Sequence, residues 1–71
     1  MIKIKKITTS EADCIIYSKK PFGLFYLLHN GIYIGIDNSN GHAWVEEFYN
    51  LQQCKKWLLN PSIKAPLMEV A

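Results

Sequence analysis

The stretch from Gly23 to Phe48, GLFYLLHNGIYIGIDNSNGHAWVEEF, decides the fold of this chain. Apolar and β-branched residues dominate it, and two short clusters of Asn, Gly and Ser interrupt them. Such clusters are typical of turns between strands, because these residues tolerate positive φ or hydrogen-bond to their own backbone. The stretch therefore predicts three consecutive antiparallel strands, a β-meander.

The first turn, Asn30-Gly31, predicts how the first two strands pair. Asn-Gly is the strongest short-range signal for a two-residue type I′ hairpin, in which both central residues have positive φ. This hairpin places Tyr26 opposite Gly35. Side chains alternate along a strand, so one face of the hairpin is apolar, and we expect it to form the core. The residues of this expected core face are Phe25, Leu27, Ile32, Ile34 and Ile36, with His29 at its rim.

Residues 38–41, Asn-Ser-Asn-Gly, predict the second turn. If they form a four-residue loop, Asp37 lies opposite His42 and Gly35 lies opposite Trp44. Two further residues then join the expected core face: Ala43 and Val45.

A first helix is predicted over residues 10–19. Ser10 can cap its N-terminus, and Asp13 stands three residues later, where a carboxylate can reach back to the cap. Pro21 follows as a terminator. A competing interpretation makes residues 14–17 a strand, because β-branched residues there lower helix propensity.

A second helix is predicted after the meander. Asn50 can cap it, and Leu51, Cys54 and Leu58 recur at helical spacing. Asn60-Pro61 ends it. The remaining residues, 61–71, have no periodicity, and we expect either an extended tail or a short segment that lies on the body of the protein.

These predictions combine into an α+β fold of one small domain, residues 1–71, with its core in about residues 10–60. Residues 1–7 alternate Ile and Lys and form either a short edge strand or a loosely held terminus. The order is then N-terminal segment, helix, three-stranded antiparallel meander and C-terminal helix. We expect both helices to pack on the core face.

Composition favours a folded chain in a reducing compartment. The 71 residues are 49% hydrophobic, with a formal net charge of +2, which differs from a disordered composition. The two cysteines are too few for a disulfide scaffold and lie in no Cys/His cluster. The N-terminus lacks the apolar run of a signal peptide, and no stretch is long enough to span a membrane. We therefore expect a cytoplasmic protein that does not contact membranes.

Four segments carry a resemblance to known sequences: PFGLFY at 21–26, YIGIDN at 33–38 followed by Gly41, AWVEEF at 43–48, and CKKWL at 54–58. Together they resemble a pattern in small uncharacterised proteins of Gram-positive bacteria and their phages or mobile elements. The resemblance covers about two-thirds of the chain. It implies a bacterial or phage setting, and because no activity is known for that group it transfers no functional residue.

No motif indicates catalysis, a metal or a cofactor. His29 and His42 fall on opposite faces of the predicted sheet, and neither has a nucleophile beside it in the sequence. Residues 37–41 superficially resemble a calcium loop, but the glycine comes one position early and no acidic twelfth position follows. We expect the protein not to be an enzyme.

The second face of the predicted sheet is unusual because it is rich in aromatic residues. A meander that exposes one face to water alternates apolar and polar residues, and this one does not. One interpretation is that a helix or a terminal segment covers this face as a second core. The other is an exposed interaction surface. The candidate surface residues are Tyr26, Leu28, Tyr33, Gly35, Asp37, His42, Trp44 and Glu46.

Two functions follow as hypotheses. The first is a small non-catalytic protein-binding module, an accessory or inhibitor of bacterial, phage or mobile-element origin, which uses the aromatic face to bind a protein partner or to form a homodimer. The alternative is a nucleic-acid-binding protein that uses the same face together with lysine pairs at 5–6, 19–20 and 55–56. The chain has no Arg, which weakens the alternative because phosphate recognition commonly recruits Arg.

Overall fold

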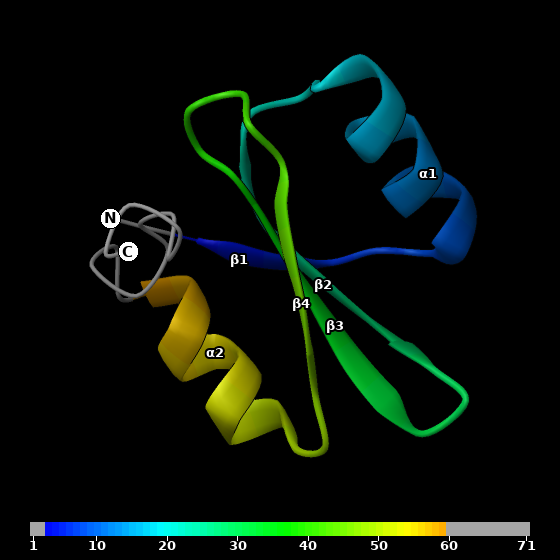
Figure 1. Cartoon of the computed structure of the whole chain (residues 1–71), viewed down its shortest axis with the longest axis vertical. Coiled ribbons are helices and arrows are strands. Elements are labelled where there is room, and N and C mark those ends of the chain that lie inside the picture. Colours follow the sequence, from blue (N-terminus) through cyan, green and yellow to red (C-terminus); the bar gives the residue numbers. More distant parts are fainter. Residues whose placement is uncertain (1–2, 60–71) are drawn as a thin grey trace, which may run out of the picture.

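The fold is α+β, with a mixed sheet between two helices (Figure 1). The computed structural model describes residues 3–59. The elements in chain order are β1 (Ile4–Lys6), α1 (Thr9–Ser18), β2 (Gly23–His29), β3 (Ile32–Asn38), β4 (Trp44–Phe48) and α2 (Leu51–Leu59). The strands lie side by side in the same order, and β2, β3 and β4 form the predicted antiparallel meander.

The Asn30-Gly31 hairpin is confirmed. Asn30 has φ 53° and Gly31 has φ 79°, the two positive values that a type I′ turn requires. The register between β2 and β3 is the predicted one along the whole hairpin, including Tyr26 opposite Gly35. Local turn chemistry is therefore sufficient to align these two strands.

The register between β3 and β4 differs from the prediction by two residues. Asp37 pairs with Trp44 and not with His42, because Asn38 continues β3 and does not begin the turn. The Asn38 side chain is fully buried: its Oδ1 accepts from the Ala43 backbone N–H at 3.1 Å and its Nδ2 donates to the Pro21 carbonyl at 2.8 Å. A shift of two residues leaves every side chain on its predicted face.

The first helix is confirmed, and the strand interpretation of residues 14–17 is wrong. The helix is capped two residues earlier than predicted, by Thr8. The Thr8 Oγ1 accepts from the Glu11 N–H at 3.2 Å, and Glu11 Oε1 accepts from the Thr8 N–H at 2.9 Å. This capping box lowers the pKa of Glu11. Ile7 and Ala12, which flank the box, share one buried cluster and staple the helix to the sheet.

Residues 4–6 of the N-terminal segment form a strand, β1, which pairs parallel to β2. Ile7 extends this pairing, since its N–H donates to the Tyr26 carbonyl at 2.9 Å. Parallel neighbours need a crossover connection, which α1 supplies. The predicted tail, residues 61–71, lies outside the described residues.

The second helix is also confirmed: Asn50 Oδ1 accepts from the Gln53 N–H at 2.8 Å, and Cys54, Trp57 and Leu58 are buried. Its position is not the predicted one. The prediction that both helices pack on one face of the sheet is wrong, because α1 and α2 lie on opposite faces (Figure 1). The sheet is apolar on both faces, and a second helix covers the face with the larger aromatic side chains.

Two apolar clusters result. The α1 core contains Ile7, Ala12, Ile15, Phe25, Leu27, Ile36 and Ala43, with Ile34 packed against it. The α2 core contains Leu24, Cys54, Trp57 and Leu58, with Ile4, Tyr26, Tyr33, Trp44 and Phe48 packed against it. Two members of the expected core face lie outside this core: Ile32 is half-buried and belongs to neither cluster, and Val45 is 43% exposed, because α1 packs mainly on β2.

We predict that Gly31→Val lowers the free energy of unfolding by about 1–2 kcal/mol, the usual cost of a left-handed backbone for a residue with a Cβ. No atom lies within 4 Å of a Cβ placed at Gly31, so the cost comes from φ alone. Denaturant unfolding measures it. Gly31→Asn is the control and is expected to be better tolerated, because Asn accepts positive φ. Equal stability of the Val and Asn variants would contradict the turn assignment.

Candidate functional site

Helix α2 covers the centre of the aromatic face. Tyr26, Tyr33 and Trp44 are partly buried against the α2 core, and Gly35 is buried beneath it. Of the remaining candidate residues, Leu28, His42 and Glu46 are exposed, and Asp37 is buried. Of the two interpretations of this face, the structure corresponds to a second core covered by a helix.

At Gly35, side chains of α2 lie directly against the sheet. A Cβ at this position would lie 3.0 Å from Cys54 Sγ and 3.2 Å from two ring carbons of Trp57. The aromatic ring next to Gly35 is therefore that of Trp57 in α2, and the residue opposite Gly35 on β4 is Glu46 and not Trp44, as the predicted register had it. Trp57 also contacts Phe48, with ring centroids 5.7 Å apart.

Asp37 and the histidines have local partners. Asp37 Oδ1 accepts from the Ser39 N–H at 2.9 Å and from the Ser39 hydroxyl at 2.6 Å, an arrangement that stabilises the turn after β3. His42 is exposed and lies against Trp44, with ring centroids 5.7 Å apart. His29 is at the end of the hairpin, with its Nε2 3.3 Å from Asn30 Nδ2.

The cysteines are far apart in the fold. Cys14 is exposed on α1, whereas Cys54 is buried in the α2 core, and burial raises the pKa of the Cys54 thiol. A raised pKa keeps a thiol protonated and poorly nucleophilic. Within residues 3–59 there is no group of three or more His, Cys, Asp or Glu side chains that could hold a metal ion.

An open groove lies on the opposite face, between α1 and β4. It has a volume of about 400 Å³. Residues from α1 and from β2, β3 and β4 line it, among them Asp13, Ile16, Leu27, Ile34, Val45 and Glu47. Ile16 is 37% exposed and Val45 is 43% exposed. We call this feature the α1–β4 groove.

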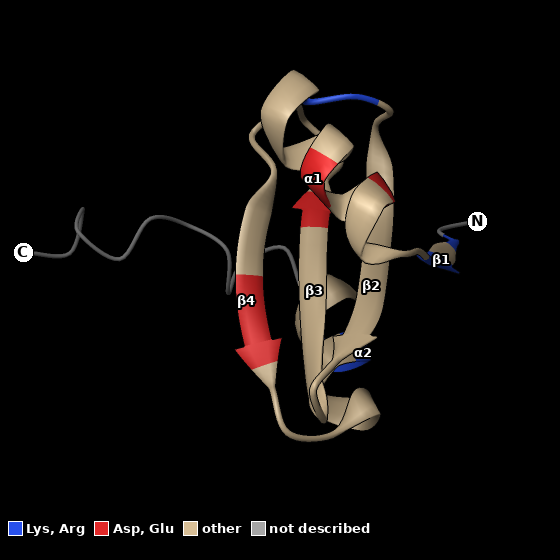
Figure 2. Ribbon diagram, turned by 90° about the vertical axis from the view of Figure 1, so that its right-hand side faces the viewer, with Lys and Arg blue, Asp and Glu red and all other residues tan. Residues whose placement is uncertain are grey.

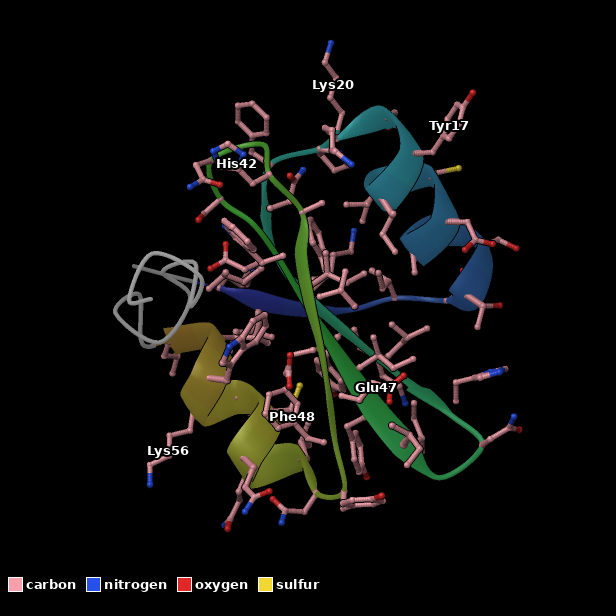
Figure 3. The ribbon with its side chains drawn as sticks, viewed as in Figure 1. Tyr17, Lys20, His42, Glu47, Phe48 and Lys56 are labelled. Carbon is pink, nitrogen blue, oxygen red and sulfur yellow. The ribbon has the colours of Figure 1, made fainter. Side chains whose placement is uncertain are left out.

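The groove adjoins an open edge of the sheet. β4 is the last strand in the order, so within the described part of the chain no strand pairs with its outer side. Figure 2 shows β4 beside the sheet region that α1 leaves uncovered, with its acidic residues along the strand. In Figure 3, Phe48 lies on the α2 side of β4, whereas Glu47 extends to the other side.

The charge of the groove is acidic. Asp13 and Glu47 line it, Glu46 is exposed next to Glu47, and none of the lining residues is Lys. Lys5 and Lys6 lie in β1, at the other end of the strand order. Sequence reasoning missed this groove because it assigned Ile34 and Val45 to a covered core.

Comparison with protein-family models, with curated proteins and with solved structures gives no match for this chain. The fold and the groove are therefore the observations from which function is argued. None of the helices in residues 3–59 is long and apolar enough to cross a membrane.

We predict that Gly35→Ala lowers the free energy of unfolding by about 1–3 kcal/mol, because the added methyl group overpacks the contact with α2. Cys54→Ala removes the nearest atom, the Sγ at 3.0 Å. The two substitutions together should therefore cost less than the sum of their separate effects, as a double-mutant cycle measures. Additive costs would show that the Cys54 side chain does not press on the added methyl group.

We predict that the two thiols react with a disulfide reagent at different rates in the folded protein. Cys14 is exposed and reacts quickly, whereas Cys54 is buried and reacts only when α2 opens. The absorbance of the released thiol product follows the fast reaction of Cys14 and the slow reaction of Cys54. In concentrated guanidinium chloride the chain unfolds, so both thiols should react quickly. Cys14→Ser removes the fast phase. Equal rates for both thiols under native conditions would contradict the position of α2.

Proposed function

We propose that this chain is a small non-catalytic protein-binding module whose binding site is the α1–β4 groove with the adjoining edge of β4. The observation that supports this most is the position of Val45, an exposed apolar side chain between an open groove and an open strand edge. Exposed apolar surface of this kind commonly marks a site for another protein. An accessory or inhibitor role in a bacterium, phage or mobile element is part of the proposal.

The proposed site differs from the aromatic surface that the sequence suggested. Tyr26, Tyr33 and Trp44 pack against α2, so a partner that used their rings would first have to displace the helix. The groove requires no such rearrangement. Glu46 is common to both surfaces, because it lies on β4 at the edge of the sheet.

The alternative function, nucleic-acid binding, has less support. Base stacking needs accessible rings, and the rings of the aromatic face are packed against α2. The open groove is mostly apolar, its Asp and Glu lining residues are Asp13 and Glu47, and no Lys lines it, which disfavours a phosphate backbone. The exposed lysines of β1 lie at the opposite edge of the sheet from β4.

Selection of binders from a random peptide display library tests the proposal without knowledge of the natural partner. We predict that binders enriched on the parent protein lose affinity for the Val45→Lys variant by about tenfold or more, equivalent to about 1.4 kcal/mol. The reason is that the substitution places a charge in the apolar part of the site. Calorimetric titration of the selected peptides measures the change.

Gln52→Lys is the matched control, because it adds the same charge at an exposed position on α2. It should leave binding unchanged, and both variants should unfold at the same temperature as the parent. Binders that do not distinguish Val45→Lys from the parent would contradict the groove as the binding site.

A further inference from the structure

We infer that the occupant of the α1–β4 groove is an extended, basic segment of another protein, which pairs with β4 as a fifth strand. This inference rests on the proposed function and specifies the partner of the same site. It follows from three features: the main-chain groups at the edge of β4, the acids along that edge, and the position of the apolar residues on one side of it.

The register identifies the main-chain groups that a new strand would meet. His29 and Ile32 close a two-residue type I′ hairpin, and such a closing pair exchanges both backbone hydrogen bonds. Bonding direction alternates along an antiparallel strand, so even-numbered residues of β3 bond to β2 and odd-numbered residues bond to β4. Because Gly35 pairs with Glu46, the N–H and C=O groups of Val45 and Glu47 point outward. A strand edge of this kind is the site at which peptides add to a sheet.

The acids specify the charge of the segment. β4 has five residues, and two adjacent ones, Glu46 and Glu47, are exposed acids on opposite faces of the strand. Asp13 adds a third acid to the groove from α1. Opposite charges on neighbouring strands stabilise a sheet, and like charges destabilise it. A partner strand with Lys or Arg beside Glu46, on the α2 side, is therefore favoured, and Glu47 and Asp13 on the α1 side add to the attraction of a basic segment.

The same rule disfavours pairing between the β4 strands of two copies, because acids would then face acids across the interface. Among the strands of residues 3–59, one pairing between two copies is compatible with charge: β1 of the second copy would bring Lys5 and Lys6 to the edge of β4. That arrangement is an outcome which the experiment below must separate from a foreign strand.

The apolar side chains specify the pattern of the segment. Val45, Ile34 and Ile16 lie on the α1 side of the sheet, so alternate side chains of an added strand would lie over the groove. The other side chains would lie on the α2 side, beside Glu46. Basic residues alternating with β-branched apolar residues satisfy both sides, and a segment of about five residues matches the length of β4, about 17 Å.

The experiment uses a blocked, fluorescently labelled peptide of about seven residues in which lysine alternates with valine, titrated into the parent protein at low salt. We expect saturable binding that protects the amide protons of Val45 and Glu47 from exchange. Two control peptides have one change each: glutamate in place of lysine, and N-methylation of the backbone along one edge, which prevents strand pairing. Both should bind about tenfold more weakly or worse.

Three protein variants locate the effect. Glu46→Gln and Glu47→Gln together should weaken binding of the lysine peptide by about tenfold at low salt, with a smaller effect at high salt. Gln52→Lys, on α2, should change it by less than about twofold, because that residue lies on the opposite helix. Val45→Pro removes an outward N–H from the edge and should weaken binding about as much as N-methylation of the peptide.

The outcomes separate this inference from the proposed function. Equal binding of the N-methylated or the glutamate peptide would overturn the strand or the charge assignment, respectively. If display binders are sensitive to Val45→Lys but the lysine peptide does not bind, this inference fails and the proposed function stands. Self-association of the parent that Lys5→Glu with Lys6→Glu abolishes in sedimentation would identify a second copy as the occupant and would also overturn it.

Discussion

The close contact between α2 and Gly35 determines which surfaces this protein can offer to a partner. Without a side chain at that position, Cys54 and Trp57 can lie directly against the backbone of β3. The helix then covers Tyr26, Tyr33 and Trp44, so an aromatic face that looks like a binding surface in the sequence becomes part of the interior. The accessible apolar surface is consequently on the other side of the sheet.

The two helices cover their faces unequally. α2 packs on β2, β3 and β4, whereas α1 packs mainly on β2. α1 is also the crossover between the parallel strands β1 and β2, and this connection keeps it at that end of the sheet. The uncovered part of the sheet, next to β4, is the groove. Because α1 must connect β1 to β2, it leaves the apolar surface next to β4 uncovered.

The parts of this fold that depend on neighbouring residues could be predicted from sequence. Asn30 and Gly31 both tolerate the positive φ of a type I′ turn, and the whole β2–β3 register follows from that turn. The β3–β4 register could not be predicted in the same way, because Asn38 is buried by partners from two other segments, Pro21 and Ala43. The face of the sheet on which α2 packs depends on contacts between distant parts of the chain, and the position of the groove depends on it in turn. The face on which each β4 side chain lies was nevertheless predicted correctly, since a two-residue shift in register does not exchange the faces.

The distribution of charge over the two edge strands has a consequence at distances beyond contact. Lys5 and Lys6 lie in the strand at one end of the sheet, and Glu46 and Glu47 lie in the strand at the other (Figure 2). These two strands therefore contribute a dipole component directed across the sheet. In the field of a charged partner this dipole produces a torque that turns the acidic edge toward a cation before the surfaces meet. The range of this orientation is set by the screening length, about 10 Å at 0.1 M salt, so the fraction of productive collisions depends on ionic strength.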